Sequence, residues 1–365
     1  MAAASASSRV QRRATKEGAQ GTLSAAGSAV DSLTKPVSPP GPSGRPGLLH
    51  WDDLPAWRRD NVFIRHGYRP TSNSYAASIW SITAVHNESV NVWTHLGGAV
   101  VAAVLGGCLY LERGPIHETV GRLAGDGSVL ALALLPSTQS ASSLLVLSCF
   151  AAGAVACLGM SATYHALSNH SASVARWGNK LDYSGIVLLI VGSYMPTLYY
   201  GLFCHPRWLA VYMYLIILLG LACLAVSWLD HFRTPQWRPY RAMLFVGLGA
   251  CGVIPIAHSL FFLEGRDIAA EGFVDSLATR FHRLDARMGL RWVLLQGGLY
   301  IFGAFLYAAR LPERLRPGRF DIWGSSHQIF HVFVLLAAAT HLRGIVQAYT
   351  HHHVAMGAQC PVPPL

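Results

Sequence analysis

Four side chains capable of metal binding or proton transfer lie at the ends of long apolar segments. His165 comes near the end of one such segment and Asp182 near the start of the next, while His327 and His331 open the last one. The spacing of His327 and His331 places both imidazoles on one face of a helix. Because ionisable groups are costly in a bilayer, those within or at the ends of membrane spans are the first candidates for function.

Three imidazoles and one carboxylate form a donor set that suits zinc. In catalytic sites zinc takes three protein ligands and keeps a fourth position for water. We therefore expect His165, His327 and His331 to bind Zn²⁺, and Asp182 either to join them or to hold the water. The second role is favoured, because three histidines already complete an open catalytic site. Ser161, one turn before His165, is a candidate hydrogen-bonding group at the same site.

The composition of the 365-residue chain is that of a membrane protein. Apolar residues make up 52% of it and charged residues only 13%, about half of the roughly 25% found in soluble domains. These values argue against a soluble enzyme or a secreted disulfide scaffold. The net charge of +10 would suggest a nucleic-acid partner in a soluble chain. In a membrane protein, however, Lys and Arg set the topology, so no nucleic acid is expected.

Seven apolar segments are long enough to cross the hydrocarbon core as helices. They are predicted at residues 90–111, 143–166, 181–202, 207–229, 241–263, 290–309 and 326–348. The fold class is therefore all-α, a seven-transmembrane helix bundle. A short helix is expected near residues 74–85, and the long first and fifth loops have room for surface helices.

The predicted organisation has four parts. Residues 1–47, rich in Ala, Ser, Gly and Pro, are expected to be a disordered cytoplasmic N-terminus. Residues 48–89 read as an interfacial cytoplasmic segment, residues 90–348 as the seven-transmembrane domain and residues 349–365 as an extracytoplasmic tail.

The distribution of basic residues predicts the orientation. With a cytoplasmic N-terminus and an external C-terminus, about two thirds of the 28 Lys and Arg residues lie on the inside, as the positive-inside rule requires. The four candidate groups of the zinc site then fall in the same cytoplasmic leaflet. The sequons that begin at Asn87 and Asn169 would face the cytoplasm and stay unglycosylated. The plasma membrane and the endoplasmic reticulum fit the spans equally well.

Other residues that resemble ligands have simpler interpretations. His95, His258 and His341 are interpreted as interfacial residues bonded to backbone or water, and the histidines at 351–353 as part of a solvated tail. The seven cysteines form no CxxC pair, so neither a zinc ribbon nor a disulfide framework is indicated. Most of them are interpreted as small apolar packing residues. The arginines at 310–319 are interpreted as a topology signal and a contact for lipid phosphate.

Between roughly residues 50 and 348, a set of short motifs occurs in one order. They are Gly67-Tyr68-Arg69-Pro70, His86-Asn87-Glu88, Asn91, Trp93-Thr94-His95, Ser161, His165, Leu181-Asp182-Tyr183-Ser184-Gly185, Pro312-Glu313-Arg314, Pro317-Gly318, Phe320-Asp321-Ile322-Trp323 and Ser326-His327-Gln328-Ile329-Phe330-His331. With these motifs the chain resembles the progestin and adipoQ receptor family, closest to its adiponectin receptor and fungal haemolysin III-like branch.

The resemblance implies a seven-helix bundle with a cytoplasmic N-terminus and a buried zinc near the cytoplasmic side. By motif, the family's zinc histidines fall on His165, His327 and His331, its water-binding carboxylate on Asp182 and a nearby hydroxyl on Ser161. Relatives show ceramidase-like hydrolysis of lipid amides, and alkaline ceramidases look similar at the same five positions. Fungal members are linked to lipid and zinc metabolism and to signalling by external protein ligands.

The leading hypothesis is a zinc-dependent hydrolase of ceramide-like lipid amides that is regulated as a receptor. Zinc would activate a water, Asp182 would transfer its proton to the leaving amine and Ser161 would bond the developing oxyanion. The alternative is a non-enzymatic membrane receptor in which zinc is purely structural. A transporter or channel is less favoured, because no internal repeat or charged relay is visible. Prolines 196 and 255 either open the bundle or act as static kinks.

Overall fold

The structure is a computed structural model, and it describes residues 47–108, 141–233, 235–263 and 273–360. Within these ranges, regular structure is helical apart from one isolated bridge between Leu49 and Tyr68. Residues from Leu48 onward form one compact unit. Its α-helices are α1 (Tyr75–Ser81), α2 (Ser89–Cys108), α4 (Ala141–Leu167), α5 (Ala172–Gly201), α6 (Pro206–Trp228), α7 (Arg238–Ala250), α8 (Val253–His258), α9 (Phe273–Met288), α10 (Leu290–Ala309) and α11 (Ser326–Thr350).

Seven helical segments of the described chain are long and apolar enough to cross a membrane. Five are single α-helices, namely α2, α4, α5, α6 and α10; the other two, residues 239–263 and 326–355, combine α-helix with a π-helical turn. The predicted all-α bundle of seven spans is confirmed, with boundaries that differ by several residues. Residues 1–46 and most of the first loop lie outside the described residues. The expected disorder of residues 1–47 therefore stays a prediction.

The third and second spans, α5 and α4, pack closely along their length. A Cβ atom at Gly185 would lie 2.7 Å from the Cα of Cys157, and one at Gly192 would lie 2.5 Å from the carbonyl oxygen of Cys149. Only glycine allows this approach of two backbones, a common device in membrane helix pairs. Because α4 carries His165 and α5 carries Asp182, this packing sets the position of one relative to the other.

The fifth span is interrupted. α7 and α8 are separated at Cys251 and Gly252, and a π-helical turn, Ser259–Leu263, follows α8. The hydroxyl of Tyr194 in α5 donates to the carbonyl oxygen of Gly249 at 2.6 Å, so a side chain of α5 binds a carbonyl beside the break. This satisfies a polar group that would otherwise be costly in a bilayer.

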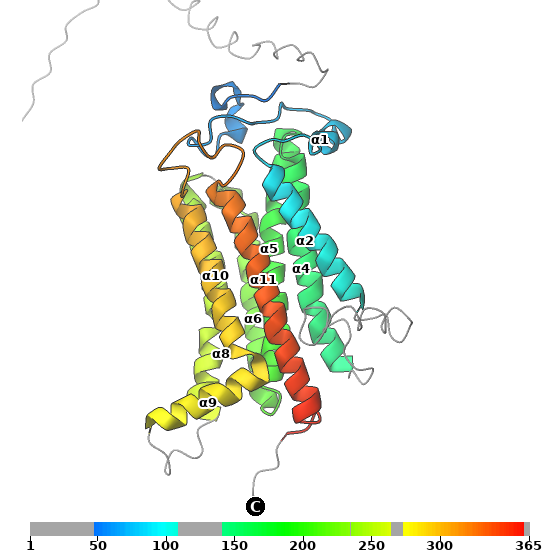
Figure 1. Cartoon of the computed structure of the whole chain (residues 1–365), viewed down its shortest axis with the longest axis vertical. Helices are drawn as coiled ribbons and strands as arrows, with labels where there is room; N and C mark the ends of the chain where they lie inside the picture. Colours follow the sequence, from blue (N-terminus) through cyan, green and yellow to red (C-terminus); the bar gives the residue numbers. More distant parts are fainter. Residues whose placement is uncertain (1–46, 109–140, 234, 264–272, 361–365) are drawn as a thin grey trace, which may run out of the picture. The chain divides into compact units, whose positions relative to one another are not determined.

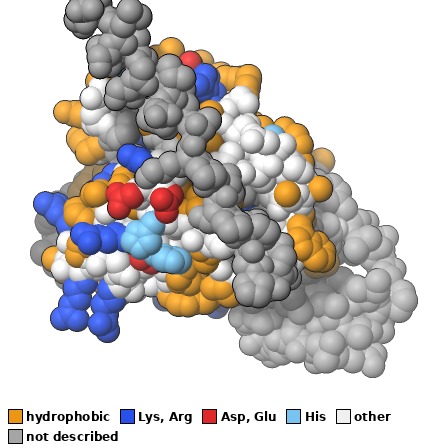
Figure 2. All heavy atoms as spheres, turned by 90° about the horizontal axis from the view of Figure 1, so that it is seen from above, with side chains coloured by type: hydrophobic (Ala, Val, Ile, Leu, Met, Phe, Trp, Pro, Cys, Tyr) orange, Lys and Arg blue, Asp and Glu red, His pale blue; other side chains and the backbone are white. Residues whose placement is uncertain are grey.

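Short elements and loops cover one end of the bundle. Residues 48–88 and the loop 310–325 lie together at the upper end in Figure 1. They are joined by hydrogen bonds from the amide of Arg65 to Asp321 at 2.9 Å and from the amide of Gly318 to the Phe63 carbonyl at 3.0 Å. Figure 2, which looks on to this end, shows basic, acidic and histidine side chains gathered there. We call residues 48–88 and 310–325 the polar cap.

The opposite end of the bundle holds a surface helix. α9, in the fifth loop, crosses the ends of its neighbours in Figure 1. Its Leu284 is fully buried with Leu290, against Ile256 and Leu260 of the fifth span. The amide of Gln347 in α11 donates to the Asp285 carbonyl at 2.6 Å. The fifth loop thus contains a surface helix of the kind for which the sequence left room.

Two expectations for the C-terminal segment were wrong. Cys204, just after α5, forms a disulfide with Cys360, although cysteine spacing gave no sign of a disulfide. The segment at 351–353 is not a solvated tail, because α11 continues as a π-helical turn through Ala355. Within it His352 is 2% exposed, and its ring lies 4.3 Å from that of Phe203. The disulfide and this ring contact attach the tail to the end of the bundle.

Candidate metal centre

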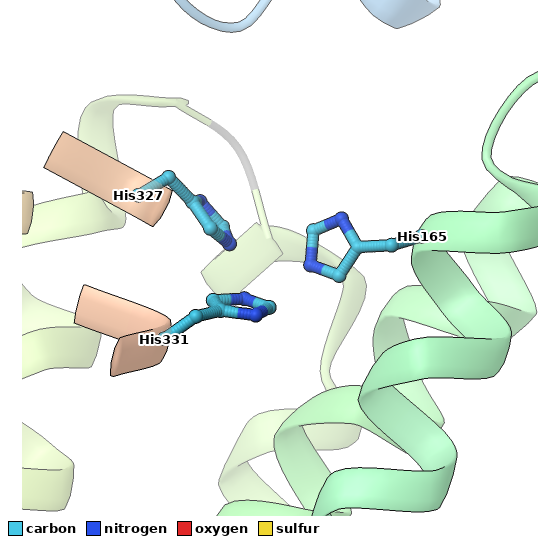
Figure 3. A group of neighbouring side chains, drawn as sticks. All are labelled: His165, His327 and His331. Atoms are coloured by element: carbon cyan, nitrogen blue, oxygen red, sulfur yellow. The ribbon is translucent and has the colours of Figure 1, made fainter. Parts of the chain in front are cut away.

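The three histidines predicted as zinc ligands come together from two spans. His165 projects from the last part of α4, and His327 and His331 project toward it from the first turns of α11 (Figure 3). The ring of His165 lies 4.9 Å from that of His327 and 4.8 Å from that of His331. One ring nitrogen from each residue lies within 4.8 Å of the other two. His165 and His331 are buried and His327 is partly buried, so the three imidazoles can converge on one ion.

The hydrogen bonding of these imidazoles suits a metal ion. Nδ1 of His165 lies 2.7 Å from Oε2 of Glu88, and an ionised carboxylate can only accept, so Nδ1 carries the proton. Nε2 of His165 then has a free lone pair, and it is buried with no hydrogen-bond partner among the described residues. Nδ1 of His331 is likewise buried with no hydrogen-bond partner among the described residues. Buried nitrogens without partners cost free energy unless a ligand satisfies them.

Glu88 is a site residue that the functional reading of the sequence missed, although it lies in a quoted motif. Burial works to raise the pKa of Glu88, but the imidazole of His165 and hydrogen bonds from His165 and Asn91 outweigh it and hold the pKa well below its usual range. The amide of Asn91 donates to Oε2 of Glu88 at 2.6 Å. A carboxylate behind a histidine is the usual arrangement that fixes the tautomer and orientation of a metal-binding imidazole.

Asp182 and Ser161 lie beside the histidines, in the wall of one cavity that also includes His327 and His331. The Ser161 hydroxyl is close enough to hydrogen-bond the Asp182 carboxylate. This contact places Ser161 next to the expected base. The oxyanion role expected for Ser161 stays a prediction.

A buried arginine of the polar cap holds the end of α4. Arg69 is 2% exposed, and its guanidinium donates to the carbonyl oxygens of His165 at 2.6 Å and Ala166 at 2.9 Å, and to the Ser81 hydroxyl at 2.9 Å. Burial lowers the pKa of Arg69 to about 10, so it stays charged at neutral pH. A cation that binds the last carbonyls of a helix stabilises its C-terminal end. Arg69 thereby fixes the turn that carries His165.

The start of α11 is held in a comparable way. The fully buried carboxylate of Glu313 accepts from the amide of Ser326 at 2.8 Å and from its hydroxyl at 2.5 Å. Gln328 accepts from the amide of Gly324 at 2.6 Å and donates to the carbonyl oxygen of Asn87 at 3.0 Å. Acidic groups at a helix start satisfy its free amides. These contacts orient the turn with His327 and join it to the segment that carries Glu88.

Two histidines interpreted as interfacial residues are buried inside the bundle. His95 is 3% exposed, and its ring stacks on that of His331 at 3.7 Å. His341 is 2% exposed, and its Nε2 lies 3.1 Å from the carbonyl oxygen of Ser193. The third, His258, is partly buried, with Nδ1 2.8 Å from the Tyr212 hydroxyl. Periodicity placed these residues on spans, but only helix packing shows which way they face.

The cavity beside the histidines is long and mostly apolar. Its volume is about 380 Å³, within the usual range for small-molecule sites. Apart from the polar groups already named, it is lined by side chains of α5, the fifth span, α10 and α11, including Ile186, Leu189, Tyr300 and Val334. Its shape and lining suit an extended apolar ligand with a polar end at the histidines.

Comparison with known proteins identifies the family. The sequence pattern of the family described as haemolysin-III related matches residues 83–342, more than half of the chain. The chain belongs to the haemolysin-III related family. It is 39% identical over 309 residues to the ADIPOR-like receptor IZH2 of Saccharomyces cerevisiae, a match that covers 85% of this chain and 86% of the yeast protein. The expected resemblance to the adiponectin receptor and haemolysin III-like proteins is confirmed.

Two animal proteins are similar to this chain to a comparable degree. The chain is 40% identical over 316 residues to the adiponectin receptor protein of Drosophila melanogaster and 38% identical over 315 residues to the progestin and adipoQ receptor-like protein 1 of Caenorhabditis elegans. These matches cover 87% and 86% of this chain. The chain spans only 62% of the fly protein and 63% of the worm protein.

Proposed function

We propose that this protein is a zinc-dependent membrane hydrolase of ceramide-like lipid amides. The observation that carries the proposal is the convergence of His165, His327 and His331 at one end of an apolar cavity, whose wall includes His327, His331 and Asp182. Three imidazoles with two buried, unpartnered nitrogens are the donor set of a catalytic zinc. Zinc held there supplies a Lewis acid and lowers the pKa of a water toward 7.

The residues around the histidines have separate tasks in this proposal. Asp182 accepts the proton of the attacking water and delivers it to the nitrogen of the leaving amine. Water thus adds its oxygen to the acyl carbon, the C–N bond breaks, and a fatty acid and an amine are released. Ser161 holds the Asp182 carboxylate in position. Glu88 orients His165.

The substrate class follows from the cavity. An acyl chain is an extended apolar group, and each methylene that it buries contributes about 0.8 kcal/mol to binding. The groups proposed to act in hydrolysis lie at the histidines, so the amide lies there and the acyl chain extends along α5, α10 and α11. A lipid enters such a cavity from the bilayer.

The second candidate function is a membrane receptor in which the zinc is purely structural. It is favoured by the names of the fly and yeast relatives, which are both called receptors. A metal that joins α4 to α11 would stabilise the bundle without turnover. An external protein ligand would then act on the face opposite the polar cap, in the plasma membrane or the endoplasmic reticulum.

One experiment separates the two functions. The purified full-length protein is loaded with zinc, its metal content is measured, and fatty acid released from ceramide is followed over time. Asp182→Asn serves as the matched control, because it keeps the shape of the side chain. Release by the wild type and none by the variant, with equal zinc in both, supports the enzyme. Full zinc content without turnover on any lipid amide leaves the receptor.

A further inference from the structure

The cavity has a second polar level, away from the histidine cluster. His341 of α11 and Gln296 of α10 line it together with the groups of the metal centre. His331 and His341 are ten positions apart on one helix, which corresponds to about 15 Å along the helix axis at roughly 1.5 Å per residue. Apolar side chains line the cavity between the two levels, among them that of Val334.

His341 and Gln296 lie at the same height in the bundle. Gly344 of α11 packs against Trp292 of α10, where a Cβ atom on the glycine would lie 3.0 Å from the tryptophan Cβ. α10 runs toward the polar cap and α11 runs away from it (Figure 1). One helical turn from this contact toward the polar cap therefore leads from Trp292 to Gln296 on α10, and from Gly344 to His341 on α11. Two polar side chains therefore line the cavity at about the same height.

The structure determines which hydrogen-bonding groups this level offers. Nε2 of His341 lies 3.1 Å from the carbonyl oxygen of Ser193, and a carbonyl can only accept, so Nε2 carries the proton and Nδ1 is an acceptor. The ring of Phe150 stands edge-on to the imidazole at 4.9 Å. Nδ1 of His341 and Oε1 of Gln296 are both buried with no hydrogen-bond partner among the described residues.

Two buried acceptors without partners favour a ligand that donates a hydrogen bond. Leaving such groups unsatisfied costs free energy, and a hydroxyl group placed between them removes the cost. An unsubstituted acyl chain has no hydrogen-bond donor and leaves both acceptors unpaired. The ligand that fits both levels is an apolar chain with a polar head at the histidines and a hydroxyl far along its length.

We propose that His341 and Gln296 form a subsite for a hydroxyl group on the acyl chain, about a dozen carbons from the head group, since the two levels are about 15 Å apart. This inference rests on the proposed function, in that it requires an acyl chain in the cavity. It adds the chemical class of chain that the protein prefers. A bound water is the competing occupant, because buried waters often satisfy unpaired acceptors.

The test compares two fatty acids that differ by one hydroxyl. Ricinoleic acid carries a hydroxyl on its twelfth carbon, and oleic acid is the matched chain without it. Dissociation constants of both acids are measured with the full-length protein in detergent. Ricinoleic acid is expected to bind roughly fivefold more tightly, the ratio that one net hydrogen bond provides.

Variants assign this preference to the subsite. Gln296→Leu removes one acceptor with little change in volume, and it is expected to abolish the preference, so that the two acids bind equally tightly. His341→Leu is the second variant, in case the first one misfolds, and Thr340→Val on α11 is the control that keeps the preference. Retention of the preference in both Gln296→Leu and His341→Leu overturns the subsite.

The outcomes also separate this inference from the proposed function. Equal binding of the two acids by the wild type overturns the hydroxyl subsite in favour of water, and leaves the acyl cavity and the hydrolase standing. Failure of both acids to bind overturns the subsite and the acyl cavity together. A preference for ricinoleic acid in a protein that releases no fatty acid from ceramide supports the subsite and removes only the enzyme.

Discussion

The carboxylate of Glu88, just before α2, lies 2.7 Å from Nδ1 of His165, near the end of α4. This contact joins two spans at the metal centre and leaves Nε2 of His165 as the nitrogen available to a metal. Glu88 is thus the partner that fixes the tautomer of one proposed ligand, since the histidine must donate to it.

Glu88→Gln is expected to weaken zinc binding by about 10- to 100-fold, because the amide no longer fixes the tautomer and charge behind His165. Zinc affinity is measured by competition with a chelator of known affinity. Asp52→Asn, at an exposed carboxylate of the polar cap, is the control and should bind zinc as the wild type does. Unchanged affinity in Glu88→Gln would show that the contact has no part in metal binding.

His331→Ala is expected to abolish stoichiometric zinc, because two imidazoles from different helices make a much weaker site than three. The measurement is the metal content of the purified protein by mass spectrometry. His282→Ala, at an exposed histidine of α9, removes an imidazole from the opposite end of the bundle and should keep one zinc per chain. Full zinc in His331→Ala would rule out the proposed ligand set.

Asp182→Asn is expected to keep zinc and to lower the rate of amide hydrolysis by roughly 10²- to 10⁴-fold, the usual effect of removing a general base. Zinc content and fatty acid release are measured on the same preparation. Loss of zinc in this variant would instead make Asp182 a metal ligand, the role that the sequence favours less.

Arg69→Met is expected to lower the Tm by about 5 °C or more, because carbonyl oxygens at the end of α4 lose buried, charged hydrogen bonds. Arg69→Lys should recover only part of this, since an ammonium lacks the planar fork of donors. Thermal unfolding in detergent gives both values. Arg316→Met, at an exposed position of the polar cap, is the control, and an equal Tm in all variants would contradict the role of Arg69.

The bond between Cys204 and Cys360 is expected to form in cells, because the predicted orientation places this end of the bundle outside the cytoplasm, where disulfides persist. Alkylation of the denatured protein by a maleimide of high mass should label two more thiols after reduction than before. Cys360→Ser is the control. It leaves Cys204 as a free thiol, so its labelling should be the same with and without reduction. Identical labelling of the wild type with and without reduction would argue against both the bond and the orientation.

Much of the fold could be predicted because its signals are local. Apolar runs near 20 residues are set by the thickness of the bilayer, and each run must satisfy its own backbone by forming a helix. The spans were therefore found with small errors at their ends. A kink in the fifth span could be expected at Pro255, which has no amide to donate to the carbonyl oxygen of Cys251, and the span is interrupted at Cys251 and Gly252. The contact of Tyr194 with Gly249 beside this break could not be predicted, since it comes from another helix.

The proposed ligands could be named from the sequence because residue type and spacing define the donor set. His327 and His331 share a helical face by spacing alone, and the positions of His165 and Asp182 at span ends marked them as costly groups. Glu88 and Arg69 gave no such signal of a role at the site. Each acts through a contact with His165 from a distant part of the chain.

The sequence by itself thus determined a bundle of seven membrane helices and the residue types that a zinc site needs, because periodicity, length and donor chemistry are properties of local sequence. Only the tertiary structure decided that three imidazoles converge, that Glu88 lies behind one of them and that His341 faces a cavity with Gln296. Those relations depend on the rotation and depth of each helix against its neighbours, which side-chain packing sets across the whole bundle.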